Sequence, residues 1–488
     1  MFNVLNSKQF SALSSRRLAI LFLLVIIALV ILTRNHFLMI SKRELIVPLA
    51  TIDSSASREW VLVPVVPFPT IKDEVSWSDV LAFWQDGDSR VLPTLFCTEE
   101  VEAGLETLLG EPNTDAPIKI VSSEKIIDEA WAVRPSSWAI VPFDQLVPRW
   151  KVLRLDGVDV LEKGLANKNY PLRIYFSDSQ PTNRDEEQMT VLMMTGVTAL
   201  VRATAAQMER NGVLYPSQYV GSVLRSADIT HISNEVPFAQ NCPFPDANQK
   251  TLTFCSDPRY IELLRSVGTD VVELTGNHFE DYGAEATQET VAMYDQEGWR
   301  HYGGGIDLAE AQKPLTMTDH GNSVSFMGCN PVGPVYAWAG ENYPGAAPCD
   351  FDYMYETLGQ LRNKTVPIVT WQYEEFYRYS PTPQQREDFR RMIDAGAKIV
   401  SGSQSHHPQA MEFYNDGFIH YGLGNLFFDQ MDELGTRQEC IDRHVIYNGR
   451  HISTEILTFM LEDYAQPRPM TTEERRVLLK SLFSASGW

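Results

Sequence analysis

The chain has 488 residues, of which 44% are hydrophobic, which is enough for roughly two or three domains with complete cores. Its formal net charge is -22 at pH 7, and it lacks the Lys and Arg clusters that bind nucleic-acid phosphates. These values exclude a nucleic-acid-binding surface. Tight binding of another polyanion would need a local basic patch, and the nearest candidate is a predicted helix that carries Arg386, Arg390 and Arg391.

The first predicted element is an apolar helix near the N-terminus. Residues 18–32 are an unbroken apolar run that follows Lys8, Arg16 and Arg17. At about 1.5 Å per residue the run covers about 22 Å, less than the roughly 30 Å of a bilayer core unless it continues to residue 40. The alternatives are a cleaved signal peptide, for which no small-residue cleavage site follows directly, and a buried core helix. We expect residues 1–44 to be a tail and a single transmembrane anchor in the cell membrane, with the main body extracytoplasmic.

The next segment, residues 59–176, alternates between strand-like and helical patterns. This alternation predicts a small α/β domain. Residues 138–144, followed by residues 153–157 and 170–172, distantly resemble a lobe of a periplasmic solute-binding protein. The strand-like pieces are residues 61–66, 118–121, 138–141 and 172–176, and the helical pieces are residues 80–84, 98–109 and 123–130.

A polar run at residues 177–188 links this segment to a second predicted domain, residues 190–465. Strands and helices alternate there as well, which again predicts an α/β fold. The elements expected in the rest of the chain are a strand at residues 191–194, a helix near residues 200–211, alternating elements down to Asp429, and an amphipathic helix at residues 471–483 in a C-terminal tail, residues 466–488.

Polar clusters follow several short apolar strands of this second domain. Because open α/β sheets place their sites at the carboxyl ends of successive strands, these clusters predict a functional site. The strands are residues 271–274, 368–370, 399–401 and 418–421, with a crossover helix at residues 384–395, and the clusters that follow or adjoin them are residues 275–283, 371–375, 402–407 and 424–425.

The six cysteines fit no CxxC or Cys/His zinc pattern. Cys242 and Cys255 bracket a short Pro-rich loop that a disulfide would staple, and Cys329 with Cys349 is a second candidate pair across a Gly/Pro-rich loop. Buried free thiols are the alternative for the other cysteines. Paired cysteines fit an extracytoplasmic body.

The second domain carries a set of motifs in a fixed order. The motifs are Ala227-Asp228 to Asn234-Glu235, residues 271–283 with Gly-Asn-His and Asp-Tyr-Gly, Glu374-Glu375-Phe376, residues 394–397, His406 with Pro408-Gln409 and Glu412, and residues 421–429. This set resembles the CapA family of capsule and poly-γ-glutamate biosynthesis proteins. The resemblance implies a calcineurin-like metallophosphoesterase fold, a layered sandwich of two packed sheets flanked by helices, in proteins that are commonly membrane-anchored and face outward.

The resemblance also implies a metal site. In such sites two divalent ions, here Mn, Zn or Mg, lie about 3.5 to 4 Å apart, bridged by a carboxylate, and they clamp a phosphate and activate water. Carried over by motif, the metal ligands are Glu235, Asn277, His278 and His406, and the candidate catalytic residues are His278, Asp281 and Glu375.

The sequence also departs from the family pattern. An Asp is expected after Gly196, and Val197 stands there; a His is expected at Trp371, and two more are expected at Ser403 and Gln404. A bridging carboxylate and three imidazoles are therefore missing. The residues nearby that offer a replacement are His231, Gln372, Glu374 and His407.

Two functions from different classes follow from this pattern. The first is a metal-dependent, phosphoesterase-type hydrolase or transferase in the synthesis of a capsule-type anionic polymer. The second is a catalytically degenerate binding or scaffold subunit that keeps the fold without the metals. In either role we expect the membrane, other capsule-synthesis subunits and an anionic polymer as partners.

Overall fold

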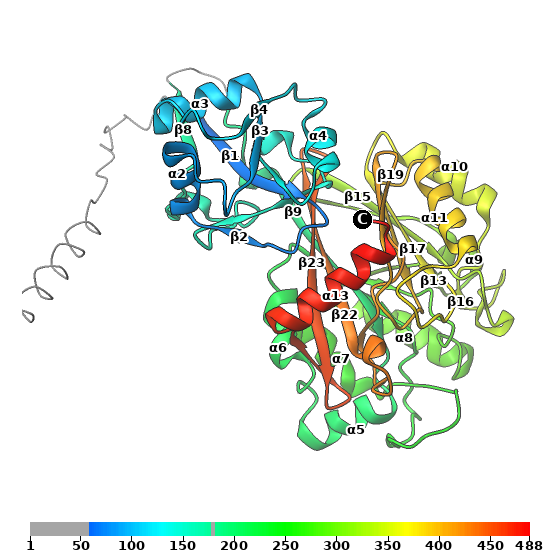
Figure 1. Ribbon diagram of the computed structural model, residues 1–488. Coiled ribbons are helices and arrows are strands. Elements are labelled where there is room, and N and C mark those ends of the chain that lie inside the picture. Colours follow the sequence, from blue (N-terminus) through cyan, green and yellow to red (C-terminus); the bar gives the residue numbers. More distant parts are fainter. Residues whose placement is uncertain (1–57, 177–180) are drawn as a thin grey trace, which may run out of the picture. The chain divides into compact units, whose positions relative to one another are not determined.

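The computed structural model describes residues 58–176 and 181–488, whose contacts join them into one unit (Figure 1). The predicted membrane anchor, residues 1–44, lies outside the described residues. Within the described part of the chain, no helix is both long enough and apolar enough to cross a membrane.

The first part of the described chain forms a six-stranded sheet with the order β4-β3-β5-β1-β6, in which β8 also pairs with β1. Ser76 and Thr98 cap the first two helices with their side chains, as polar residues before an apolar helical run are expected to do. The strands are Arg58–Pro67 (β1), Thr94–Cys97 (β3), Ile118–Ile120 (β4), Ser137–Pro142 (β5), Trp150–Val152 (β6) and Arg173–Phe176 (β8), a small pair is Glu74–Val75 (β2) with Arg154–Leu155 (β7), and the helices are Trp77–Asp86 (α2), Glu99–Leu109 (α3) and Ile126–Ala132 (α4).

An eight-stranded mixed sheet follows, with the order β12-β11-β10-β9-β22-β23-β24 and with β21 paired to β9. Strands β9 to β12 run parallel, whereas β22, β23 and β24 are antiparallel. The sequence motifs end near Gln430, and the long strands β22 and β23 were not expected. The strands are Met189–Thr198 (β9), Ile229–Asn234 (β10), Val271–Glu273 (β11), Arg300–Tyr302 (β12), Asn425–Phe427 (β21), Gln438–Tyr447 (β22), Arg450–Glu462 (β23) and Gln466–Pro469 (β24).

The third large sheet has six strands in the order β14-β15-β17-β18-β20-β19. Its four central strands are parallel, as expected for strands joined by crossover helices. The strands are Leu315–Asp319 (β14), Asn322–Cys329 (β15), Val366–Gln372 (β17), Ile399–Ser403 (β18), Met411–Tyr414 (β19) and Gly417–His420 (β20), and a short pair is Gly304–Gly305 (β13) with Gly345–Ala346 (β16).

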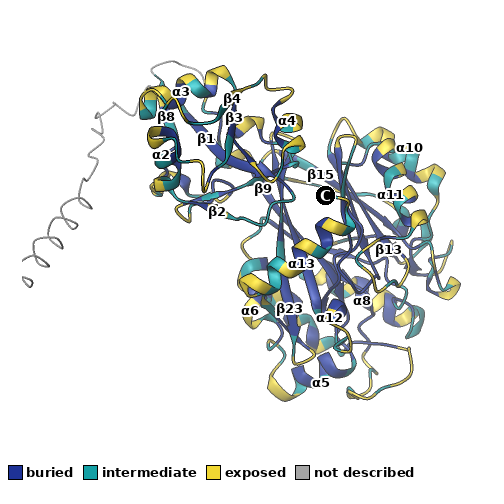
Figure 2. Ribbon diagram, viewed as in Figure 1, coloured by how far each residue is buried: buried dark blue, intermediate teal, exposed yellow. Residues whose placement is uncertain are grey.

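Helices cover the outer faces of the eight-stranded and six-stranded sheets, so these parts form four layers (Figures 1 and 2). Three apolar clusters hold the layers together. One lies between helices α5 to α8 and the eight-stranded sheet, one lies between the two sheets, and one lies between the six-stranded sheet and helices α10 and α11. The helices are Arg202–Asn211 (α5), Ser217–Leu224 (α6), Ile261–Ser266 (α7), Gly283–Glu297 (α8), Leu308–Gln312 (α9), Phe351–Leu361 (α10), Pro383–Ala395 (α11), Leu434–Arg437 (α12) and Thr472–Ala485 (α13).

The N-terminal sheet shares its core with the eight-stranded sheet. Val191 and Val445, from β9 and β22, belong to the same apolar cluster as the core of the N-terminal sheet. Ion pairs add to this contact, because Arg443 lies 3.2 Å from Asp159 and Arg154 lies 2.7 Å from Glu455. The chain is therefore a mixed α/β protein of several sheets.

Candidate functional site

The polar cluster predicted at the strand ends is present at the edge shared by the two packed sheets. Strands β10, β11, β17 and β18 carry most of its residues at or just beyond their carboxyl ends, and the first residue of β21 completes it. The residues brought together are Glu235, Asn277, Gln372, Gln404 and, one step further out, His406 and Asn425.

Gln372 lies at the centre of this cluster. Its Nε2 donates to Glu235 Oε1 at 3.3 Å, to Asn277 Oδ1 at 3.1 Å and to Gln404 Oε1. Its Oε1 accepts a hydrogen bond from Ser403 Oγ at 2.7 Å. Only 1% of Gln372 is exposed, so the carboxamide is a buried bridge between the two sheets.

Glu235 follows β10 and is only 2% exposed. Its backbone N–H donates to the carbonyl of Thr198 at 2.9 Å, which fixes its position against β9. Gly276 makes room on the other side, because a Cβ there would lie 2.6 Å from the carbonyl oxygen of Glu235. The second carboxylate oxygen of Glu235, Oε2, has no hydrogen-bond partner.

His278 and Asp281 form a dyad beside Glu235. Nδ1 of His278 lies 2.6 Å from Asp281 Oδ2, and the Asp281 side chain is 2% exposed. Burial lowers the pKa of His278, but the hydrogen bond to Asp281 and the negative charges of Glu235 and Asp281 outweigh it, so the pKa of His278 is raised. The protonated form of this imidazole is therefore favoured more than that of a free histidine.

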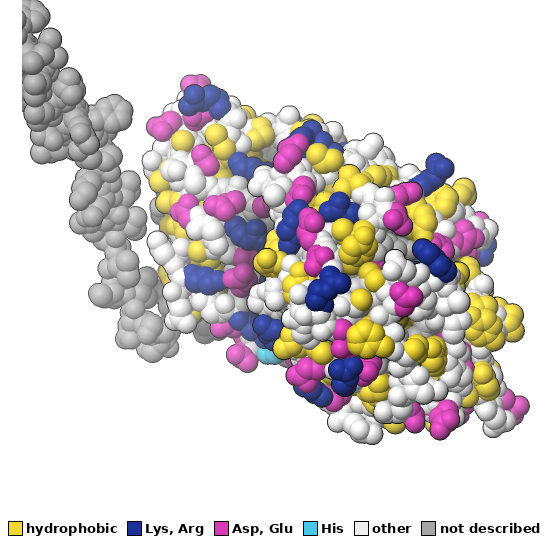
Figure 3. Space-filling view, turned by 90° about the horizontal axis from the view of Figure 1, so that it is seen from below, with side chains coloured by type: hydrophobic (Ala, Val, Ile, Leu, Met, Phe, Trp, Pro, Cys, Tyr) yellow, Lys and Arg dark blue, Asp and Glu magenta, His cyan; other side chains and the backbone are white. Residues whose placement is uncertain are grey.

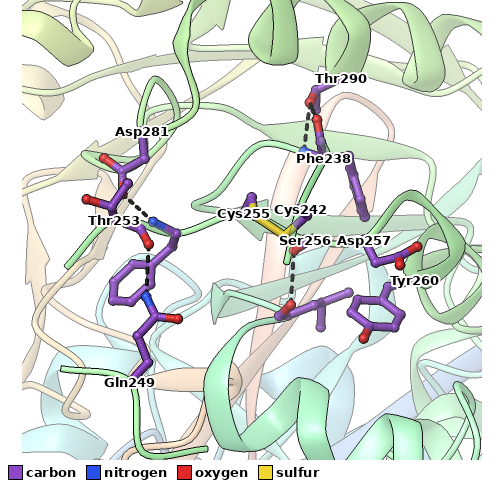
Figure 4. The surroundings of a disulfide bond; sticks show 12 residues. Phe238, Cys242, Gln249, Thr253, Cys255, Ser256, Asp257, Tyr260, Asp281 and Thr290 are labelled. Carbon is purple, nitrogen blue, oxygen red and sulfur yellow. Dashed lines mark hydrogen bonds between the residues drawn. A yellow bond between two sulfur atoms is a disulfide. The ribbon is translucent and has the colours of Figure 1, made fainter. Parts of the chain in front are cut away.

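Two disulfide-closed loops meet at Asp281. Both predicted cysteine pairs are confirmed: Cys242 with Cys255 and Cys329 with Cys349. The first loop delivers the backbone N–H of Phe254, which donates to Asp281 Oδ2 at 2.8 Å, and the second delivers the hydroxyl of Tyr336, which donates to Asp281 Oδ1 at 3.2 Å. Figure 4 shows the first of these loops with Asp281 and Thr253. Asp281 is thus fixed from both sides.

The Phe254 ring belongs to the same arrangement. It lies 4.7 Å from the His278 ring, measured between centroids, and 5.1 Å from the guanidinium of Arg202. Arg202 in turn forms an ion pair with Asp429, whose carboxylate also accepts from the backbone N–H of Ala203 at the start of α5. Asp429 therefore neutralises the positive end of this helix and the nearest arginine at once.

His406 is buried, and Asn425 sets its orientation. His406 Nδ1 lies 2.8 Å from Asn425 Oδ1, while Asn425 Nδ2 donates to Gln430 at 3.3 Å. Since the amide oxygen is an acceptor, His406 carries its proton on Nδ1 and leaves Nε2 as the accepting nitrogen. His406 has a positive φ of 51°, which lets the chain turn sharply after β18.

Glu375 lies at the exposed end of a chain of hydrogen bonds that leads to His406. The Tyr377 hydroxyl donates to Glu375, and Gln430 Nε2 donates to the Tyr377 hydroxyl at 3.2 Å. Burial, the hydrogen bond to Glu375 and the charges of Glu375 and Glu235 raise the pKa of Tyr377. Glu375 is therefore linked to the site through Tyr377, Gln430 and Asn425 and has no hydrogen bond to the central carboxamide.

Of the four possible replacements for the missing ligands, only Gln372 joins the cluster. His231 lies in the core between the sheets, where its Nε2 is 2.8 Å from the Tyr302 hydroxyl. Glu374 is exposed. His407 turns away, because its Nδ1 lies 2.7 Å from the carbonyl oxygen of Pro408.

The predicted ligand set omits Gln404 and Asn425, which the structure places in the site. Both stand in the polar clusters that follow predicted strands, so the signal for them was their position after the strand, not their residue type. Gln404 and Asn425 are 5% and 1% exposed.

The residues present do not fit a two-metal centre. Glu235 is the one carboxylate that contacts the central carboxamide, and Val197, fully buried, stands where the resemblance calls for a second carboxylate. The N–H groups of Gln372 point at the oxygens of Glu235, Asn277 and Gln404, and N–H groups repel a cation.

Another group with metal-ligand chemistry occurs in the described part of the chain. It consists of Asp228, Asp319 and His320, whose ligand atoms lie within 4.8 Å of one another. Lys163 Nζ already lies 2.5 Å from Asp228 Oδ1 and 3.0 Å from His320 Nε2, so a lysine supplies the positive charge. Because Asp228 precedes β10, this group is at the opposite edge of the sheet from the site.

Comparison with known proteins agrees with the motifs. Residues 191–430 match the family described as "Bacterial capsule synthesis protein PGA_cap". The chain is 23% identical over 298 residues to the capsule biosynthesis protein CapA of Bacillus anthracis, covering 60% of this chain and 72% of that protein. It is 26% identical over 245 residues to the PGA biosynthesis protein CapA of Bacillus subtilis, covering 49% of this chain and 64% of that protein.

Among solved structures, a 5'-nucleotidase precursor from Thermus thermophilus is similar over 61% of this chain and 59% of its own, with 13% identity and a TM-score of 0.37. That score is too low to carry a conclusion about fold or activity. The match to the family comes from the sequence and does not depend on this structural similarity. Residues 191–430 of the chain belong to the family of bacterial capsule synthesis proteins.

Proposed function

We propose that the chain is a membrane-anchored accessory protein in the synthesis of a capsule-type anionic polymer, such as poly-γ-glutamate, and that its family domain acts as a binding or scaffold subunit. The family and the two CapA relatives support the link to the polymer. One observation carries the scaffold role: the Gln372 carboxamide directs N–H groups at the oxygens that a metal would need. The domain keeps the four layers expected of a metallophosphoesterase-like sandwich while its site has lost the matching donor set.

The proposed location is the outer side of the cell membrane. The apolar run at residues 18–32 supports an N-terminal anchor. The two disulfides support maturation of the body of the protein in an oxidising compartment.

Contact with other synthesis subunits is a better proposal than direct binding of the polyanion to α11. The arginines of this helix are already neutralised: Arg386 and Arg390 pair with Glu412, and Arg391 pairs with Glu387. On the face drawn in Figure 3, Lys and Arg side chains are interspersed with Asp and Glu. A polymer with one negative charge per unit gains little from such a mixed surface.

A metal-dependent hydrolase is the second candidate. It is favoured by the unpartnered Oε2 of Glu235 and by the orientation of His278 and His406, each of which has one ring nitrogen committed to a fixed partner. The missing second carboxylate at Val197 counts against it.

The test is complementation of a strain that lacks the gene, with the amount of cell-associated polymer as the readout. The full chain should restore the polymer, and the chain without residues 1–44 should not. Glu235→Gln should restore it to within about twofold, because a scaffold needs the shape of the side chain and not its charge, whereas loss of a metal-site group costs about tenfold or more.

Glu273→Gln is the matched control, since Glu273 is equally buried and lies outside the cluster. Protein levels are compared by immunoblot. Polymer that disappears with Glu235→Gln and persists with Glu273→Gln, at equal protein levels, would favour the hydrolase.

A further inference from the structure

Three oxygen atoms from three different segments converge on a single nitrogen, Nε2 of Gln372. They are Oε1 of Glu235, Oδ1 of Asn277 and Oε1 of Gln404. Carboxylate and amide oxygens converging on one point are the arrangement by which proteins hold Mg²⁺, Ca²⁺ or Mn²⁺. Here the point is filled by a group of the protein itself.

At Nε2 of Gln372 the surrounding oxygens outnumber the hydrogens. A carboxamide nitrogen carries two hydrogens, and three oxygens compete for them. A fourth oxygen, Oε2 of Glu235, is buried and has no partner at all. The oxygens around Nε2 are therefore arranged as they would be around a cation.

We infer that the Gln372 carboxamide is a built-in substitute for a cation: it holds the strand ends of both sheets together and keeps metal ions out of the cluster. The partial positive charge of its N–H groups attracts the three oxygens. Ser403 holds the amide in this orientation by donating to Oε1 at 2.7 Å. Gln372 is thus a positioning residue for Glu235, Asn277 and Gln404.

His278 lies beside Glu235 and does not contact the Gln372 carboxamide, because Nδ1 of its ring is held 2.6 Å from Asp281 Oδ2. This role of Gln372 deepens the proposed scaffold function and rests on it.

The test is the variant Gln372→Glu, which replaces the carboxamide by a carboxylate. The new carboxylate faces Glu235 and turns the cluster into a set of oxygens that needs a cation. We expect this variant to melt at a lower temperature than the wild type without metal, and to gain about 5 °C or more when 5 mM MnCl₂, MgCl₂ or CaCl₂ is added. The wild-type full chain, purified without chelator, should contain far less than one metal ion per chain and show no such shift.

Gln409→Glu is the matched control. Gln409 is fully buried and donates to the carbonyl of Phe376, and its Oε1 accepts from Gln385 at 3.0 Å, outside the cluster. Its glutamate should destabilise the fold without any rescue by metal. A simple loss of packing would affect both variants alike, so metal rescue is the readout that a merely structural role does not produce.

Two results would overturn the inference. One is a stoichiometric metal ion in the wild-type chain, which would also be decisive if Gln372→Glu failed to fold. The other is a folded Gln372→Glu variant that none of the three metals stabilises. Neither measurement depends on polymer synthesis, so failure here is distinguishable from failure of complementation.

Discussion

Asp281 controls both the orientation and the charge of His278. It accepts from His278 Nδ1, from the Phe254 backbone and from the Tyr336 hydroxyl, so one buried carboxylate collects three donors. Because the pKa of His278 is raised in the folded protein, its contribution to stability is complete at a pH below the unfolded pKa of about 6.5. The contribution is lost as the pH rises through the folded pKa.

Asp281→Asn tests this coupling. The variant loses the charge that favours the imidazolium, so we expect it to be destabilised by about 1 kcal/mol more at pH 5.5 than at pH 9. Urea unfolding at both pH values measures the difference, and the NMR titration of the His278 ring should move to lower pH. Asp295→Asn is the control, since Asp295 is exposed and lies 4.0 Å from His301. Equal destabilisation at the two pH values would contradict the prediction.

The site also shows what a motif can and cannot predict at a single position. Counting along the motif places the missing histidine at Trp371, yet this side chain is packed in the apolar cluster under α10 and α11. Successive residues of a strand face opposite sides, so Gln372 and not Trp371 reaches the site. Which residue of β17 points into the site depends on the register of the strand, and the motif alone does not predict that register.

At the scale of elements, the parallel strands and their helices were predictable and the C-terminal strands were not. Strand β17 spans Val366–Gln372 and α11 spans Pro383–Ala395, where the pattern predicted residues 368–370 and 384–395. Strand β22 is entirely buried although it contains Glu439, Asp442 and Arg443. A strand that contains charged residues lacks the hydrophobic pattern of a buried strand. It can still be buried when tertiary partners neutralise the charges, as Asp159 does for Arg443.

The side chain of Glu439 in β22 has no hydrogen-bond partner, and this destabilises the folded protein. Neither of its carboxylate oxygens has a partner, and burial raises its pKa well above the ordinary value. A raised carboxyl pKa means that the unfolded chain ionises above about pH 4.3 while the folded one stays protonated, so folding is penalised increasingly as the pH rises.

Glu439→Gln removes this penalty. We expect the variant to be more stable than the wild type by about 1 kcal/mol or more at pH 8, with the gain vanishing near pH 4. Guanidinium unfolding at the two pH values measures it, with Glu433→Gln, an exposed neighbour, as the control. A gain that does not change with pH would show that ionisation is not the cause.

At the scale of the whole molecule, the alternation of elements predicted an α/β fold and the family resemblance implied two packed sheets, whereas neither predicted the core shared with the N-terminal sheet. Val191 and Val445 look like ordinary strand residues, and nothing in their pattern says which neighbouring sheet they will meet. Contacts between distant segments are decided by packing that single-residue patterns do not encode.

Three histidines with lowered pKa values make the fold sensitive to acid. Burial lowers the pKa of His231 and of His451 to about 3, and burial with the charges of His451 and His420 lowers that of His444 well below its usual value. A lowered histidine pKa gives stability that is present above the unfolded pKa of about 6.5 and is lost as the pH falls toward the folded pKa.

We therefore expect the free energy of unfolding to fall between pH 6.5 and pH 4, by up to about 1.4 kcal/mol per pH unit for each histidine, with Glu439 acting in the opposite direction. Urea titrations at several pH values measure the slope. His451→Gln should make the slope smaller by the equivalent of about one bound proton. A slope that is the same in this variant and in the wild type would contradict the assignment.

The two disulfides that meet at Asp281 share the chain with two free cysteines, Cys97 and Cys440, and both of these thiols are buried. Burial raises the pKa of Cys97 to about 12 and that of Cys440 well above its usual value, so both thiols stay protonated at neutral pH. Disulfide exchange requires a thiolate that can reach a disulfide sulfur. The folded chain thus contains no internal nucleophile for its own disulfides, and the cysteine pairing, once made, is kinetically frozen for as long as the protein stays folded.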